Sequence, residues 1–139
     1  MTETTNTTPS PTVWHCLSYD DAPAGIDFLT AAFGFVAEAV YHEDDTNTKV
    51  MHAQLNWPPG GGIMLGSAPP REGWPDIRGK GSAYCVVESA EAVDALFARA
   101  TAAGAHVLRE PADEDYGGRG FVVLDPEGNQ WGFGSYAGE

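Results

Sequence analysis

Hydrophobic and polar positions follow two different periods along this chain, first the alternation of a strand and then the spacing of a helix. Residues 13–19 form a β-prone run. Apolar residues then recur three and four apart over 22–33, which predicts a helix with one buried face. Asp20 and Asp21, a following proline and the closing Gly34 are typical of helix ends. The pattern therefore begins with a strand and a helix.

Three further β-prone runs complete this first unit. We predict strands over 36–42, 50–57 and 62–67, separated by segments rich in residues that favour turns. Strict alternation in the middle run places Met51 on the same face as Leu55. The first half of the chain is thus predicted as strand, helix and three strands.

The same order returns in the second half. A strand is predicted over 82–87, and the helix after it ends at Gly104. A short strand over 106–109 and an acidic loop over 110–118 follow. The last predicted element is a β-hairpin over 118–136.

The hairpin is marked by the turn Asp125-Pro126-Glu127-Gly128, in which the proline presets φ and the glycine supplies a positive φ. The turn over 57–61 occupies the matching place in the first half. Two units of about 55 residues each are therefore an internal repeat. Each unit leaves one sheet face without a helix, and the two uncovered faces are predicted to form a cleft.

This organisation predicts an α+β fold of two βαβββ modules with a cleft between curved sheets. The modules are expected at residues 12–67 and 82–137. Residues 68–81 have neither period and are interpreted as a linker. The Thr-rich residues 1–11 are interpreted as a disordered tail.

Charge and composition exclude several classes of function. The net charge is −13 with seven Lys plus Arg, which argues against nucleic acid as a partner because phosphate binding needs a basic face. No apolar run has the length of a membrane span, so no membrane partner is expected. No secretory leader is recognised, and a cytoplasmic location is expected, with Cys16 and Cys85 as free thiols.

The segments 19–29, 32–35 and 121–131, together with the duplicated pattern, resemble the vicinal oxygen chelate superfamily. That group includes glyoxalase I, bleomycin-resistance proteins, fosfomycin-resistance enzymes and extradiol dioxygenases. The resemblance covers residues 12–137. It implies the fold directly, whereas the activity depends on the residues in the cleft.

The metal-binding members hold a divalent ion with His, Gln or Glu from the first and last strand of each module. The resemblance places these positions at Trp14, Met64, Ser82 and Gly132, none of which is a usual ligand for such an ion. His15 is adjacent to the first position, but alternation should turn it toward the helix. We therefore expect no metal and no other cofactor.

The remaining members resemble bleomycin-resistance proteins, which sequester a drug without chemistry. The chain is accordingly predicted to be a metal-free small-molecule-binding protein that holds an aromatic or cationic compound in an apolar, aromatic cleft. Glycines on the last strand are expected to leave this cleft roomy. Small members commonly pair modules between chains, which implies a homodimer. The alternatives are a glyoxalase-like lyase or isomerase acting on a small carbonyl compound through His52 or Tyr116, and a structural dimer with a closed core.

Alternation along the predicted strands selects the residues that should line the cleft. The candidate ligand-binding residues are Trp14, Cys16, His52, Met64, Tyr84, Tyr116 and Gln130. Trp14 is either a platform for the ligand or part of the core, and Cys16 is a nucleophile only if its pKa is lowered. Arg119 either pairs with neighbouring acids or holds an anionic group, and Trp74 is either a lid or an anchor for the linker.

Overall fold

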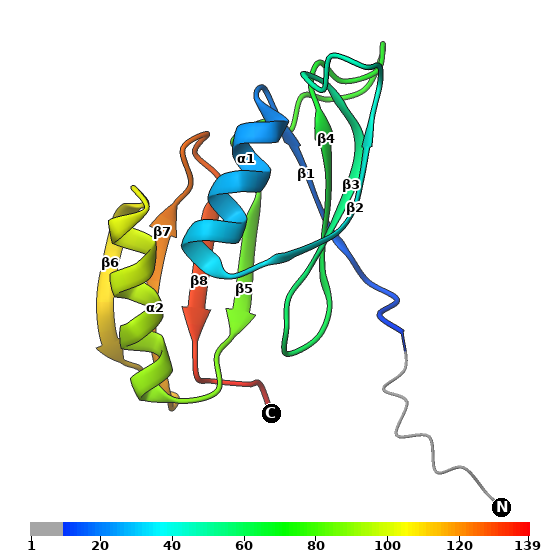
Figure 1. The fold of residues 1–139 in the computed structure, drawn as a ribbon. Coiled ribbons are helices and arrows are strands. Elements are labelled where there is room, and N and C mark those ends of the chain that lie inside the picture. Colours follow the sequence, from blue (N-terminus) through cyan, green and yellow to red (C-terminus); the bar gives the residue numbers. More distant parts are fainter. Residues whose placement is uncertain (1–9) are drawn as a thin grey trace, which may run out of the picture.

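The computed structural model describes residues 10–139, so the predicted tail at 1–11 lies almost wholly outside the described residues. Within 10–139, eight strands form two four-stranded sheets, and a helix packs on one face of each sheet (Figure 1). The predicted duplication of a βαβββ unit is confirmed by this α+β architecture.

The first sheet has the strand order β1-β4-β3-β2, in which β1 and β4 are parallel and the other neighbours antiparallel. Its elements are β1 (His15–Tyr19), α1 (Ala22–Phe28), the π-helical turn η1 (Leu29–Phe33), β2 (Val36–His42), β3 (Val50–Asn56) and β4 (Gly62–Ser67).

The second sheet repeats this topology as β5-β8-β7-β6, again with its first and last strands parallel. Its elements are β5 (Ser82–Val86), α2 (Ala90–Ala102), β6 (His106–Asp113), β7 (Arg119–Leu124) and β8 (Gln130–Gly134). The β7–β8 pair is the predicted closing hairpin, with the turn at residues 125–129.

The helices begin and end where their capping residues predict. The Asp21 carboxylate accepts a hydrogen bond from the backbone N–H of Ala24, and the Ser89 hydroxyl accepts one from the N–H of Ala92. Gly34 ends the first helical segment with a φ of 86°, a left-handed conformation that favours glycine. These local signals are sufficient to place the helix boundaries.

The predicted facing of Met51 is wrong because β3 contains a β-bulge. Tyr41 pairs with His52, whereas His42 pairs with Val50, so Met51 is the extra residue. Val50 is buried, and Met51 is 64% exposed. The bulge therefore adds a thioether to the outer face of the first sheet, the face away from α1.

The predicted acidic loop over 110–118 is also shorter than expected. Strand β6 continues to Asp113 and leaves residues 114–118 as the turn before β7. Pro111 is accommodated because β6 lies at the end of the sheet order and its pairing is irregular between Arg109 and Ala112.

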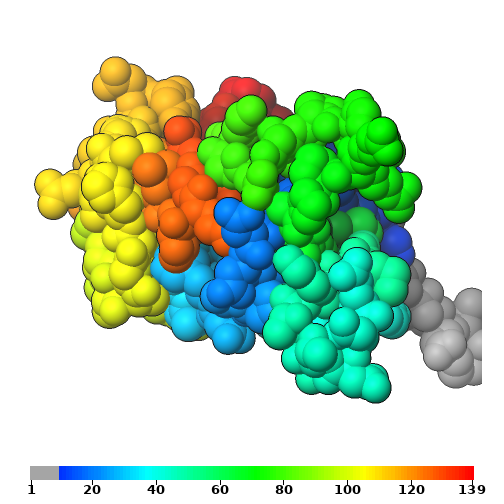
Figure 2. Space-filling view, turned by 90° about the horizontal axis from the view of Figure 1, so that it is seen from above, coloured from blue at the N-terminus to red at the C-terminus, as the bar shows by residue number. Residues whose placement is uncertain are grey.

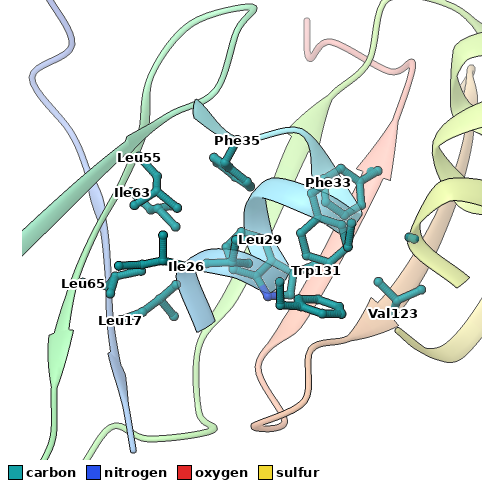
Figure 3. Packing of buried hydrophobic residues seen from close by; sticks show 14 of the residues in the cluster. Leu17, Ile26, Leu29, Phe33, Phe35, Leu55, Ile63, Leu65, Val123 and Trp131 are labelled. Carbon is teal, nitrogen blue, oxygen red and sulfur yellow. The ribbon is translucent and has the colours of Figure 1, made fainter. Parts of the chain in front are cut away.

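Aromatic side chains join the two modules in one core (Figure 3). The ring centroid of Phe33 lies 5.5 Å from that of Trp131 and 4.7 Å from that of Phe133. Phe35 packs at 5.6 Å from Trp131 and at 5.1 Å from Trp57. Because Phe33 and Phe35 follow α1 whereas Trp131 belongs to β8, neither module buries its apolar surface alone.

The closing turn contributes a buried carboxylate to this junction. Asp125 is 4% exposed and accepts hydrogen bonds from the Tyr19 hydroxyl at 2.6 Å and from Trp131 Nε1 at 3.0 Å. The Asn129 side chain and the backbone N–H groups of Glu127 and Asn129 also donate to it. Burial and the adjacent carboxylate raise the pKa of Tyr19, so its phenol remains the donor.

A second carboxylate in the same turn holds the β1–α1 junction. The Glu127 side chain accepts hydrogen bonds from the backbone N–H groups of Asp20 and Asp21, at 2.7 and 3.0 Å. Arg78, from the segment between the modules, pairs with Asp20 and Asp76. Figure 2 shows the orange turn, the blue junction and the green connecting segment side by side.

We expect Asp125→Ala to lower the free energy of unfolding by about 2–4 kcal/mol, because the Tyr19 hydroxyl and the Trp131 N–H would stay buried without an acceptor. Urea unfolding followed by tryptophan fluorescence measures this loss. Gln130→Ala, at an exposed position of the same hairpin, is the control and should change stability by less than about 0.5 kcal/mol. Equal effects of the two substitutions would contradict the central place of Asp125.

Candidate outer-face binding site

The outer face of each sheet carries the side chains that alternate away from the helix. In the first module, Cys16 on β1 lies directly opposite Met64 on β4, while Leu17 and Leu65 face the core. The predicted alternation of these two strands is thus correct. Both sulfur-containing side chains are accessible from the same side of the sheet.

A depression of about 240 Å³ lies on this face of the first sheet. It brings together Cys16, His52 and Met64, three of the predicted ligand-binding residues, and Met51 joins them because of the bulge. His52 stacks on Tyr41 with ring centroids 6.3 Å apart. The lining is dominated by polarizable sulfur and one imidazole, which suits an apolar or aromatic ligand.

A second depression, of about 380 Å³, lies on the outer face of the second sheet. It brings together Tyr84 and Tyr116, two of the candidate ligand-binding residues, with Tyr136 as a third aromatic side chain. Sequence reasoning missed Tyr136, although it stands at the end of the predicted hairpin. Continuing the alternation two residues beyond Gly134 finds it.

The glycines of β8 make room for the Tyr84 ring and do not leave the free space that was expected. A Cβ atom at Gly134 would lie 2.5 Å from the Tyr84 hydroxyl, and one at Gly132 would lie 3.4 Å from the Tyr84 ring. The hydroxyl donates a hydrogen bond to the backbone oxygen of Tyr136 at 2.6 Å. The ring therefore lies across the strand, and Tyr84 is still 50% exposed.

The other predicted residues occupy separate places. Trp14 lines a depression beside the turn after β3, together with Asn56. Gln130 is exposed at the start of β8. Trp74 is 64% exposed and packs against the guanidinium of Arg71, so it is not anchored in the core.

Arginine residues near the second depression are paired with acids. Arg119 makes ion pairs with Asp94 and Asp113, and Arg109 pairs with Glu114. The salt-bridge interpretation of Arg119 is therefore correct, although the expected neighbour Glu114 pairs with Arg109 and one partner of Arg119, Asp94, comes from α2. The hydrogen bond from Arg109 lowers the pKa of Glu114, which keeps this carboxylate ionised.

The residues present do not fit the metal ion of the metal-binding relatives. Strand register pairs Cys16 with Met64 and Tyr84 with Gly132, so the residues beside two of the four predicted positions are Cys16 and Tyr84, not Trp14 and Ser82. A thiol, a thioether, a phenol and a glycine are not the oxygen and nitrogen ligands that such an ion prefers. Within residues 10–139, no three His, Cys, Asp or Glu side chains form a metal-ligand group.

A further cavity, of about 400 Å³, lies on the core side where the two modules meet. Its lining includes His15 and Cys85, and the His15 ring lies edge-on to Trp131 with centroids 6.1 Å apart. In the described part of the chain, His15 Nε2 is buried without a hydrogen-bond partner. Burial lowers the pKa of His15 and raises the pKa of Cys85 to about 12.

Comparisons with known proteins agree with this fold. The family model described as the Glyoxalase/Bleomycin resistance protein/Dioxygenase superfamily matches residues 12–133. The chain therefore belongs to this superfamily. No curated protein sequence matches it. None of the helices in residues 10–139 has the length and apolar character needed to cross a bilayer.

Solved structures show the same architecture. TioX from Micromonospora sp. ML1 is 28% identical with a TM-score of 0.72, and the match covers 90% of this chain and 98% of TioX. The fosfomycin resistance protein FosX from Listeria monocytogenes, solved as a mutant in complex with Mn(II), is 13% identical with a TM-score of 0.67, covering 94% and 95%. A family enzyme from Burkholderia phytofirmans PsJN is 20% identical with a TM-score of 0.63, covering 87% and 94%. The last two show the fold alone.

We expect the two thiols to differ sharply in reactivity. Cys16 is exposed, whereas burial raises the pKa of Cys85 and keeps it protonated. Ellman's reagent at pH 8 should titrate one thiol in the folded protein and a second only after unfolding in guanidinium. Cys16→Ser should remove the first of these and leave the second. Rapid reaction of both thiols in the folded protein would contradict the assignment.

His15 makes stability depend on pH. Its folded-state pKa is lowered from 6.5, so the unfolded chain takes up a proton at a higher pH than the folded protein does. Stability should therefore fall as the pH drops below 6.5. We expect the loss of stability between pH 7.5 and 5.5, measured by urea unfolding, to be smaller in His15→Phe than in the wild type. Identical losses in the two proteins would contradict this role.

Proposed function

We propose that this protein binds and sequesters a small aromatic or cationic compound, without a metal, in a cleft formed between two copies of the chain. The observation that supports the proposal is the apolar and aromatic character of both outer sheet faces. Met51, Tyr84 and Tyr116 are each at least half exposed there. Large apolar side chains left open on neighbouring positions are typical of binding surfaces.

The pairing of two copies is inferred from the separation of the depressions. One is lined by the first module and the other by the second, and each is too shallow to enclose a ligand. A two-fold axis that sets the first module of one copy against the second module of the other would close both depressions at once. Exposed Val36, Tyr41 and Leu108 would extend the contact around them.

The chemistry of the two outer sheet faces favours binding a ligand without chemical conversion. Soft sulfur groups and tyrosine rings provide contact area, and the positions that face each other across the strands lack acid–base pairs. The family description, which names bleomycin resistance proteins, is consistent with this use.

A glyoxalase-like lyase or isomerase is the alternative, and its support is the position of His52 in the first depression. An imidazole can act as a general base on a small carbonyl compound. Chemical conversion of the bound compound, abolished in His52→Gln, would favour this alternative over sequestration.

The proposal is tested by sedimentation and by ligand binding on the full chain. Analytical ultracentrifugation at micromolar concentration should give a dimer. A panel of planar aromatic compounds, some carrying an amine, should contain members that raise the melting temperature with EDTA present. A ligand at a concentration of about 100 times its Kd adds about 2.7 kcal/mol to the free energy of unfolding. Mass spectrometry should recover these compounds unchanged.

Matched variants locate the binding. Tyr84→Ala and Met64→Ala should each weaken binding, because each removes contact area from one outer face. Trp74→Ala removes an exposed aromatic residue elsewhere and should leave binding unchanged. A monomeric protein that none of the compounds stabilises would overturn the proposal.

A further inference from the structure

The second depression is built from three tyrosines that come from separate segments. Tyr84 stands on β5, Tyr116 lies in the turn between β6 and β7, and Tyr136 follows β8. Tyr116 is 62% exposed, and its ring meets that of Tyr136 at 80° with centroids 4.9 Å apart. The rings therefore surround the depression on more than one side.

Two of the rings are held in place by hydrogen bonds. The Tyr84 ring lies across Gly134 and its hydroxyl is bonded to the backbone of Tyr136. The Tyr136 hydroxyl donates to the Glu139 carboxylate at 2.8 Å. Partial burial raises the pKa of Tyr84, so it is a neutral phenol at physiological pH. The rings thus present neutral, electron-rich faces.

Carboxylates lie close to these rings. Glu114 lies beside Tyr84 and Tyr116, with its side chain 13% exposed, and Glu139 lies beside Tyr136. The lining residues include no Lys or Arg, and Arg109, which also lies near Tyr116, is paired with Glu114, so this pair adds no net charge. With a net charge of −13 on the whole chain, this place attracts cations and repels anions.

We propose that Tyr84, Tyr116 and Tyr136 form a subsite for an organic ammonium group, tertiary or quaternary, carried by the bound compound. This inference rests on the proposed function and narrows its ligand to a cation at this position. A substituted ammonium has a diffuse charge and an apolar surface, so it gains both from the ring quadrupoles and from burial. The Glu139 carboxylate beside Tyr136 and the net negative charge of the chain balance its charge.

The test compares two probes of the same shape and different charge. Benzyltrimethylammonium carries a quaternary nitrogen, and neopentylbenzene has carbon in its place. Both are titrated into the full-length protein while the tyrosine ring resonances are followed by NMR. We expect the cation to bind at least about 5-fold more tightly than its neutral isostere, and binding to weaken as salt is added.

Substitutions at Tyr116 separate the ring from the hydroxyl. Because Tyr116 is exposed in a turn, its variants should keep the melting temperature of the wild type. Tyr116→Leu should weaken cation binding at least about 3-fold, Tyr116→Phe by less than about 2-fold, and Tyr116→Trp should strengthen it. Trp74→Leu is the control, since Trp74 is a similarly exposed aromatic residue that lines neither depression.

The outcomes distinguish this subsite from the proposed function as a whole. Equal affinity for both probes, lost together in Tyr116→Leu, would overturn the cation preference and leave an apolar binding site. Cation binding that persists in Tyr116→Leu but vanishes in salt would show attraction by surface charge alone. If neither probe binds while members of the aromatic panel do, the proposed ammonium subsite is wrong. If no compound binds in either assay, both the subsite and the proposed function are wrong.

Discussion

The buried carboxylate of Asp125 is the contact on which the arrangement of the two modules depends. A charge removed from water is tolerated when several donors surround it. Here the Tyr19 hydroxyl, the indole of Trp131 and the Asn129 amide supply donors, together with two backbone N–H groups. Tyr19 belongs to the first module and Trp131 to the second, so one short turn holds both.

This junction determines which surfaces stay open. Phe33, the last residue of the first helical segment, and Phe35, just after it, reach the core of the second sheet, where they contact Trp131. The helix-covered faces are therefore used for joining the modules, and the opposite faces stay exposed, with Met51 and Tyr84 open to solvent. Under the proposed function, the packing that stabilises the fold and the surface that binds the ligand lie on opposite sides of the same strands.

The outer faces also show how one fold can change its chemistry. Side chains opposite one another on β1 and β4, and on β5 and β8, are the ones able to share a bound group. In this chain they are Cys16 with Met64 and Tyr84 with Gly132. The glycine admits the tyrosine ring, which then becomes part of the outer surface. Under the proposed function, contact area and electron-rich rings take the place of hard metal ligands.

The sequence by itself determined the duplication, both helix boundaries and the closing hairpin, because caps, turn residues and periodicity act between close neighbours in the chain. It also placed Cys16, Met64 and Tyr84 on the outer faces through simple alternation. Only the tertiary structure decided the role of Asp125, since its partner Tyr19 lies 106 residues away. The exposure of Met51 required the pairing of two strands, and the tyrosine cluster required three separate segments to meet. Such contacts depend on register and packing across the whole fold, which local patterns do not encode.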